Sequence, residues 1–387
     1  MPASPSLLIV PARFKTGKLY TQIATTSAGV VLGSSGDFNV TRATTATRFN
    51  SAGLIESVAS GVPRLDYYTS GGTAGCPALL VEPAATNLAL HSRDLTNAVW
   101  SGTTVTTAKN AVGADGVASG GTTITATAAS GTVLQALSHA SQSRVFSAYI
   151  RRVTGTGAIQ LTTNGGTNWT TVTISSLYTQ VACAAQTVAS GTIGIRLAVS
   201  GDVIEVDFTQ GEVGPVATSP IATTIATGTR NAEVVTLSGA VSGCIGQTEG
   251  TIYAEVDIRT FANVGFIASI SDGTASNRVD IYKFTDSKIY FDRISSTQSA
   301  ATGLGSAALT AGIFKVAVAY KSGDTTMYIN GTQVGATQTQ TFAFSSIIKV
   351  NVGSSRSDAQ AFNDRIRSAA LYTTRLTNAE LAALTTL

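Results

Sequence analysis

The chain has 387 residues, more than a single ordinary hydrophobic core accommodates, so we expect two or three domains. Its hydrophobic content of 43% excludes wholesale disorder, and its many Thr, Ser, Gly and Val residues favour β-structure with tight turns. Only 12% of the residues are charged, the net charge is +3, and Lys and Arg do not cluster, so no nucleic-acid partner is expected.

Residues 1–90 contain six of the eight prolines. Because proline cannot donate a ladder hydrogen bond, this region is predicted to form extended segments and short strands. It shows too little periodicity to fill a core unaided, so we expect it to pack against a partner or a symmetry mate. The apolar run at residues 7–10 is too short for a secretory signal. No run approaches the ~20 residues of a membrane span, so no membrane insertion is expected.

Four short motifs follow one another between residues 41 and 88. They are Arg42-Ala43-Thr44, Gly53-Leu54-Ile55-Glu56, Pro63-Arg64-Leu65-Asp66-Tyr67, and Leu79-Leu80-Val81-Glu82-Pro83 followed by Thr86-Asn87-Leu88. In this order they resemble a segment shared by many tailed-bacteriophage fibre and spike proteins. The resemblance implies a structural protein of the virion. It would dock through its N-terminal region to other virion proteins (capsid, portal or tail components) and assemble as a homotrimer.

Arginines recur at matching positions in the resembling proteins, here Arg42, Arg64 and Arg230. In a chain so poor in charge, a guanidinium held in a β-rich segment needs a carboxylate partner, for which Asp66 and Glu82 are the candidates. We therefore predict structural or intersubunit ion pairs for these five residues.

Residues 91–230 show short alternating runs bounded by Gly, Ser or Asn, for example at 145–150, 192–197 and 203–208, which is typical of a β-sandwich. The order of motifs from Ser92-Arg93-Asp94 to Thr229-Arg230 resembles the carbohydrate-binding-module-like jelly roll that follows the same N-terminal segment in phage fibre proteins. Pro220 stands where that family usually has an aromatic residue.

Residues 231–387 again alternate, as at 252–258 and 314–320, and Asn330-Gly331 is a hairpin-turn signal. The hairpin and the closing strand resemble the concanavalin-like or laminin-G-like jelly roll. Thr377 and Glu380 form a capping box that predicts one short terminal helix. The predicted fold class is therefore all-β: a virion-attachment segment (1–90), a carbohydrate-binding-module-like sandwich (91–230) and a concanavalin/laminin-G-like sandwich (231–387).

No catalytic residue is predicted, and the protein is not expected to be an enzyme. The two histidines, His91 and His139, are interpreted as solvated or structural. A glycan-degrading spike enzyme (a glycoside hydrolase) is the alternative, and it would need a pair of carboxylates in a groove. The acidic residues Asp272, Asp280, Asp286 and Asp292 are expected to be scattered over strand ends and loops.

No metal site and no cofactor are predicted. Asp272-Gly273 and Asn277 could supply oxygen ligands for calcium, but the dense acidic run of a dedicated site is missing. The cysteines Cys76, Cys183 and Cys244 are far apart, which indicates buried or inert thiols.

A host surface glycan is the remaining partner considered. Trp169, in a Gly- and Asn-rich loop, is the candidate sugar-stacking residue, and packing in the core is the alternative. Trp100 is interpreted as a packing residue, and Tyr282, Tyr290 and Phe291 as sandwich core.

Overall fold

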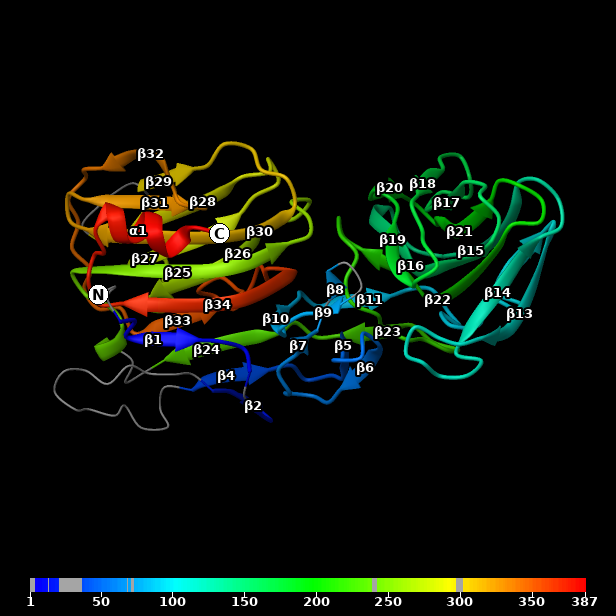
Figure 1. The fold of residues 1–387 in the computed structure, drawn as a ribbon, viewed down its shortest axis with the longest axis horizontal. Coiled ribbons are helices and arrows are strands. Elements are labelled where there is room, and N and C mark those ends of the chain that lie inside the picture. Colours follow the sequence, from blue (N-terminus) through cyan, green and yellow to red (C-terminus); the bar gives the residue numbers. More distant parts are fainter. Residues whose placement is uncertain are drawn as a thin grey trace. The chain divides into compact units, whose positions relative to one another are not determined.

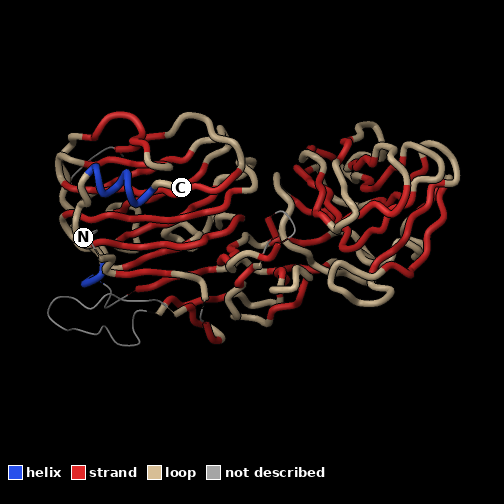
Figure 2. Tube along the Cα trace, viewed as in Figure 1, coloured by secondary structure: helices blue, strands red, loops and turns tan. Residues whose placement is uncertain are grey.

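The computed structural model describes residues 4–12, 14–20, 37–67, 69–70, 73–238, 242–296 and 302–387. It confirms the all-β fold class, because strands make up nearly all of the regular structure (Figure 2). The chain forms two compact units. Unit 1 comprises Met1–Ala43, Ala59–Pro83 and Asn231–Leu387, and unit 2 comprises Thr44–Val58 and Ala84–Arg230. Within the described residues, no helix is both long and apolar enough to cross a bilayer.

This division differs from the expected three parts, because residues 1–90 contribute to both units. β1 (Leu7–Ile9) pairs with β34 (Asp364–Tyr372), and β4 (Phe38–Thr41) pairs with β24 (Val234–Ser238). The hairpin of β5 (Ala46–Phe49) and β6 (Ile55–Val58) belongs to unit 2. The proline-rich region thus finds hydrogen-bond partners in its own chain, on strands far along the sequence.

Unit 1 is a sandwich of two sheets, which we call sheet A and sheet B. Sheet A runs in the order β32 (Thr332–Gln338), β31 (Thr325–Ile329), β30 (Gly312–Lys321), β25 (Glu249–Ile258), β34, β10 (Ala78–Val81) and β7 (Leu65–Asp66), with β1 also on β34. Sheet B runs in the order β2 (Phe14–Lys15), β3 (Lys18–Leu19), β4, β24, β33 (Lys349–Val352), β26 (Gly265–Ser271), β27 (Arg278–Lys283), β28 (Ile289–Ile294) and β29 (Thr302–Gly305). Unit 1 also contains a separate short hairpin, formed by β8 (Thr69–Ser70) and β9 (Thr73–Ala74).

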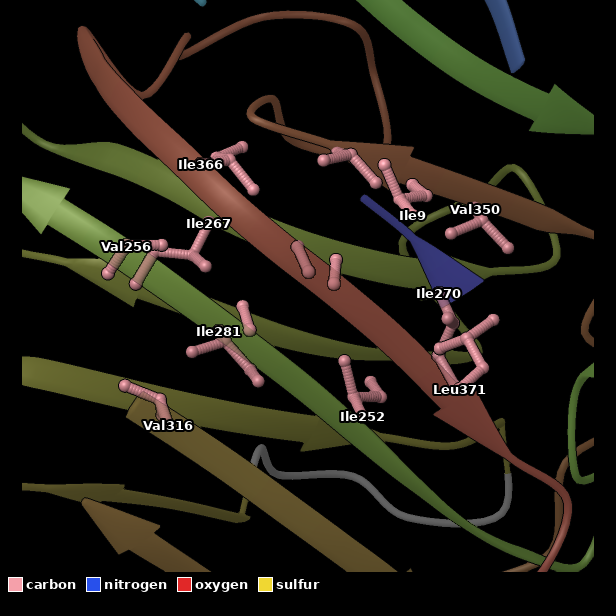
Figure 3. Packing of buried hydrophobic residues seen from close by; sticks show 14 of the residues in the cluster. Ile9, Ile252, Val256, Ile267, Ile270, Ile281, Val316, Val350, Ile366 and Leu371 are labelled. Atoms are coloured by element: carbon pink, nitrogen blue, oxygen red, sulfur yellow. The ribbon is translucent and has the colours of Figure 1, made fainter. Parts of the chain in front are cut away.

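The core of unit 1 is formed by alternate residues of the two sheets. Figure 3 shows Ile9 from β1 in the same core as Ile252 of β25, Ile270 of β26 and Val350 of β33. Phe38 of β4 is fully buried there as well. The N-terminal strands therefore supply part of the core, which their low periodicity in isolation does not reveal.

Two local predictions in unit 1 are confirmed. Asn330 and Gly331 both adopt positive φ (49° and 81°) between β31 and β32, as a type I′ hairpin requires. The helix α1 (Asn378–Thr385) starts at Thr377, whose side chain accepts from the backbone N–H of Glu380, and the reciprocal bond completes the capping box. Leu381 of α1 packs on the face of sheet A opposite the sandwich core.

Unit 2 is also a sandwich of two sheets. The first contains β13 (Val105–Ala111), β14 (Gly121–Ala126), β22 (Val203–Val213), β11 (Ala85–Asn87) and β23 (Gly228–Arg230), together with β16 (Gln142–Thr154), β19 (Thr179–Ala182) and β20 (Gln186–Val188). The second contains β12 (Ser101–Thr103), β15 (Gly131–Ala136), β21 (Thr192–Leu197), β17 (Ile159–Thr162) and β18 (Thr170–Val172). Trp100 is buried in the core between them and donates to the Leu90 carbonyl, so its packing role is confirmed.

Candidate functional site

The face of sheet B that points away from the core carries an ordered set of polar and aromatic side chains. Its strands alternate: Val279 and Ile281 of β27 enter the core, whereas Asp280 and Tyr282 take the opposite face. The cross-strand register then aligns side chains from neighbouring strands into rows. We call this surface the outer face of sheet B.

The first row is aromatic. Phe266, Tyr282 and Tyr290 lie on three adjacent strands, with ring centroids 5.1 Å and 5.6 Å apart and nearly parallel planes. Phe284 packs edge-on against Tyr290 and is 42% exposed. The expectation that Tyr282 and Tyr290 belong to the sandwich core is therefore wrong, because the two-residue period of their strands turns them outward. Phe291 is fully buried in the core, as expected.

The second row is polar and contains two carboxylates on directly paired positions, Asp292 of β28 and Asp280 of β27. Asp280 accepts hydrogen bonds from the Ser269 hydroxyl at 2.5 Å and from Arg278 Nε at 2.7 Å. The Tyr282 hydroxyl donates to Asp292 Oδ2 at 3.2 Å. The expectation that these acidic residues are scattered over strand ends and loops is therefore wrong for Asp280 and Asp292. The register of β27 against β28 places the two side by side.

Burial changes the acid–base character of this pair. It raises the pKa of Asp280, although the bonds from Ser269 and Arg278 oppose the shift. Burial likewise raises the pKa of Asp292, against the hydrogen bond from Tyr282. Asp280 is only 1% exposed, so Asp292 is the more accessible carboxyl of the two.

The other acidic residues considered from the sequence have local structural roles. Asp286 accepts from the Tyr290 hydroxyl at 2.6 Å. Asp272 accepts from the backbone N–H and hydroxyl of Thr274 and from the Asn277 amide, so its oxygens already serve its own loop. Within the described part of the chain, no group of three or more His, Cys, Asp or Glu side chains is arranged to hold a metal ion.

The charged residues singled out in the phage-like motifs lie inside the units. In unit 1, Arg64 donates to Glu82 Oε2 at 2.8 Å and to Glu233 Oε2 at 2.5 Å, and Arg42 donates to Glu233 Oε1 at 3.0 Å. All four side chains are buried. Glu233 was not singled out from the sequence. Its place beside Arg42 depends on the pairing of β4 with β24, which no local pattern indicates.

The remaining two residues of that set have separate partners. Asp66 pairs with Arg365 of β34 at 2.6 Å. Arg230, in unit 2, donates to the Ser219 hydroxyl at 2.9 Å and to the Thr218 hydroxyl at 3.2 Å. These contacts are all within one chain, and an intersubunit role for any of the five residues stays a prediction.

Trp169 and the histidines lie in unit 2. The guanidinium of Arg196 stacks over the Trp169 ring, 4.6 Å from its centroid, and the ring is half-buried. Trp169 is therefore not a core residue, Arg196 covers one face of its ring, and sugar contact there stays a prediction. His91 and His139 lie in a different unit from the four acidic residues named above.

No protein-family model and no curated protein sequence matches this chain. Solved structures do resemble part of it. The carbohydrate-binding module CBM40 of the Ruminococcus gnavus IT-sialidase matches 37% of this chain over 85% of its own length, with 17% identity and a TM-score of 0.33. The NanB sialidase of Streptococcus pneumoniae matches 39% of this chain, with 14% identity and a TM-score of 0.34. A leech intramolecular trans-sialidase matches 36%, with 16% identity and a TM-score of 0.32.

This chain covers only about a quarter of those two enzymes, 26% and 23% of their lengths. No residue role or activity is transferred from them, since the likeness is one of partial fold. The match to sialidase structures nevertheless contradicts the prediction that the protein is not an enzyme. Sialidases and a trans-sialidase are among the structures that match in part.

Proposed function

We propose that this protein is a structural protein of a tailed-bacteriophage virion, a fibre, spike or decoration protein, that touches host glycans through the outer face of sheet B. The virion role rests on the four motifs between residues 41 and 88. The glycan role rests on one observation, the row of Phe266, Tyr282 and Tyr290 beside the carboxylate row. A sandwich needs no aromatic side chains on its solvent face, whereas a sugar ring needs an apolar surface flanked by hydrogen-bonding groups.

Binding of the intact chain to an array of host glycans that includes sialyllactose tests the glycan role. Phe284→Ala and Tyr290→Ala should each lower binding at least tenfold, because they remove the most exposed part of the apolar surface. Leu177→Ala is the matched control, since Leu177 is a 64% exposed apolar side chain of unit 2. Equal binding by all four proteins would contradict the assignment of this face.

The virion role is tested on the particle itself. Antibodies against this chain should label intact phage particles, and electron microscopy of labelled particles should place it on the head or the tail. A homotrimer is expected for the released protein, and analytical ultracentrifugation measures it. Particles that contain none of this chain would contradict the proposal.

Glycoside hydrolysis is the second candidate, and the paired carboxyls of Asp280 and Asp292 favour it. A carboxyl whose pKa is raised by burial holds its proton to a higher pH than a free carboxyl and can serve as a general acid, and glycosidases place a second carboxylate close by. Incubation with host capsule or lipopolysaccharide should then release reducing ends. Loss of that release in Asp292→Asn, with retention in Asp324→Asn, which alters only the surface pair of Asp324 with Arg375 in unit 1, would establish hydrolysis that depends on Asp292. No release by the intact chain would exclude this candidate for those glycans.

A further inference from the structure

Unit 2 contains a cleft to which the proposed function assigns no role. One wall is the hairpin β5–β6, which lies beside β23 (Figure 1), and the other walls come from Arg93, Asp115 and residues 220–222 and 228–230. The hollow measures about 330 Å³. A second hollow of about 470 Å³, lined among others by His91 and Lys109, shares Arg93 and Ala222 with it. These volumes fall in the range of small-molecule sites.

The floor of the cleft is rigidly held. Arg93 makes two bonds to Asp207, at 2.8 Å and 2.9 Å, and one to Asp115 at 2.7 Å. Its guanidinium also stacks on the ring of Phe208, 4.2 Å from the centroid. Asp207 is fully buried and fixes the direction of the Arg93 guanidinium, while the Arg93 side chain as a whole stays one-quarter exposed.

The backbone beneath Arg93 is strained. Phe208 has a φ of 45°, a left-handed conformation that is strained for a bulky residue. It lies where the register of β16 against β22 shifts, so β22 carries a bulge there. A bulge re-aims side chains, and here the ring supports Arg93 while also packing against Tyr149. The residue that supports the cleft floor is thus one of the strained positions of unit 2.

The hairpin wall is held equally firmly. The Thr47 hydroxyl donates to the Pro220 carbonyl at 2.7 Å, and the backbone N–H of Ile55 donates to the Ala114 carbonyl at 3.0 Å. Glu56 pairs with Arg48 across the hairpin at 2.7 Å and remains about one-third exposed. The cleft therefore has fixed walls before any ligand arrives, which reduces the ordering cost of binding.

Acidic and basic side chains are equal in number around the cleft, and this balance favours an uncharged ligand. The lining contains two carboxylates, Glu56 and Asp115, and two guanidiniums, Arg93 and Arg230. Each carboxylate has lone pairs beyond those its arginine uses, and Thr45, Ser57 and Thr229 add hydroxyls. Paired acceptors and donors without excess charge suit an uncharged ligand rich in hydroxyl groups. An anionic sugar would meet the partly exposed carboxylates of Glu56 and Asp115.

We propose that this cleft binds one uncharged sugar residue, as a second glycan site independent of the outer face of sheet B. The hairpin at residues 44–58 then forms part of a binding site, in addition to any role in attachment. The proposal extends the glycan role suggested for unit 1, but it depends on different residues in a different unit.

The test uses the full chain and an array of neutral oligosaccharides terminating in glucose, galactose or N-acetylglucosamine, with sialyllactose as the anionic comparison. Ala222→Trp should lower binding of the neutral glycans at least tenfold, because Ala222 is exposed and borders both hollows. Ala226→Trp is the matched control: it is exposed in the same loop and outside both linings. Glu56→Gln should also weaken binding, and Glu205→Gln, which alters the comparable Arg151–Glu205 pair, should not.

Neutral-glycan binding that is lost in Ala222→Trp and kept in Ala226→Trp and Tyr290→Ala would support the cleft as a separate site. Binding that is lost in Tyr290→Ala and unchanged in Ala222→Trp would overturn the cleft proposal and leave the outer face of sheet B in place. Binding of sialyllactose alone, or no binding of any neutral glycan, would overturn it as well. Thermal melts of each variant show whether a loss comes from unfolding.

Discussion

Glu233 holds two buried arginines at once, and its replacement should measurably weaken unit 1. Its side chain is 1% exposed and accepts from Arg42, from Arg64 and from the backbone N–H of Glu82 at 3.0 Å. Glu233→Gln keeps the size of the side chain. It removes the negative charge and turns an amide N–H₂ group toward guanidinium donors, so at least one arginine loses its acceptor.

The magnitude follows from the burial of the network. Removing one partner of a buried ion pair costs about 3–5 kcal/mol, because an uncompensated charge stays inside. Arg64 keeps Glu82 at 2.8 Å, so we expect a loss near the lower end, about 3 kcal/mol. In a unit of this size each kcal/mol lowers the melting temperature by about 2–4 °C, which gives a fall of roughly 6–12 °C.

Differential scanning calorimetry of the full chain measures this fall. Glu249→Gln is the control: Glu249 pairs with Lys321 at 3.0 Å on the surface of unit 1, and its loss should change the stability by less than about 0.5 kcal/mol. Similar small shifts in the two variants would refute the reasoning that the buried network fastens β4 and β24 together.

Three further predictions concern the two sheets of unit 1. Phe38→Ala should lower the free energy of unfolding in urea by about 3–5 kcal/mol, and a loss under about 1 kcal/mol would show that the N-terminal strands are no part of the core. A fragment of residues 231–387 lacks β1, β4, β7 and β10, so it should unfold in urea without a sharp cooperative transition, and a sharp one would contradict the shared core. Because burial raises the pKa of Asp292, this carboxyl binds a proton more tightly in the folded protein than in the unfolded chain. The stability of the wild-type protein therefore falls as the pH rises from the unfolded pKa of Asp292 through its folded pKa. Asp292→Asn should therefore raise the urea midpoint at pH 7. That advantage should shrink as pH falls toward the ordinary aspartate pKa of about 3.9, and an advantage that did not change with pH would contradict this account.

The sequence alone determined the features that depend on neighbours in the chain. The alternating run at 192–197 coincides with β21 (Thr192–Leu197), the Asn330-Gly331 turn has the expected positive φ values, and Thr377 caps α1. Side-chain period, turn chemistry and caps act over two to four residues, so each is legible in a short window. The all-β class follows from the same local signals.

Strand pairing over long distances was decided only by the tertiary structure. The pairing of β1 with β34 and of β4 with β24 joins segments that lie some 200 to 360 residues apart, and it turns an apparently coreless N-terminal region into part of unit 1. Register between β27 and β28 brings Asp280 opposite Asp292 and stacks Tyr282 on Tyr290. A shift of one residue would send every one of these side chains to the other face. Register depends on how two whole sheets fill their shared core, which no local sequence window contains.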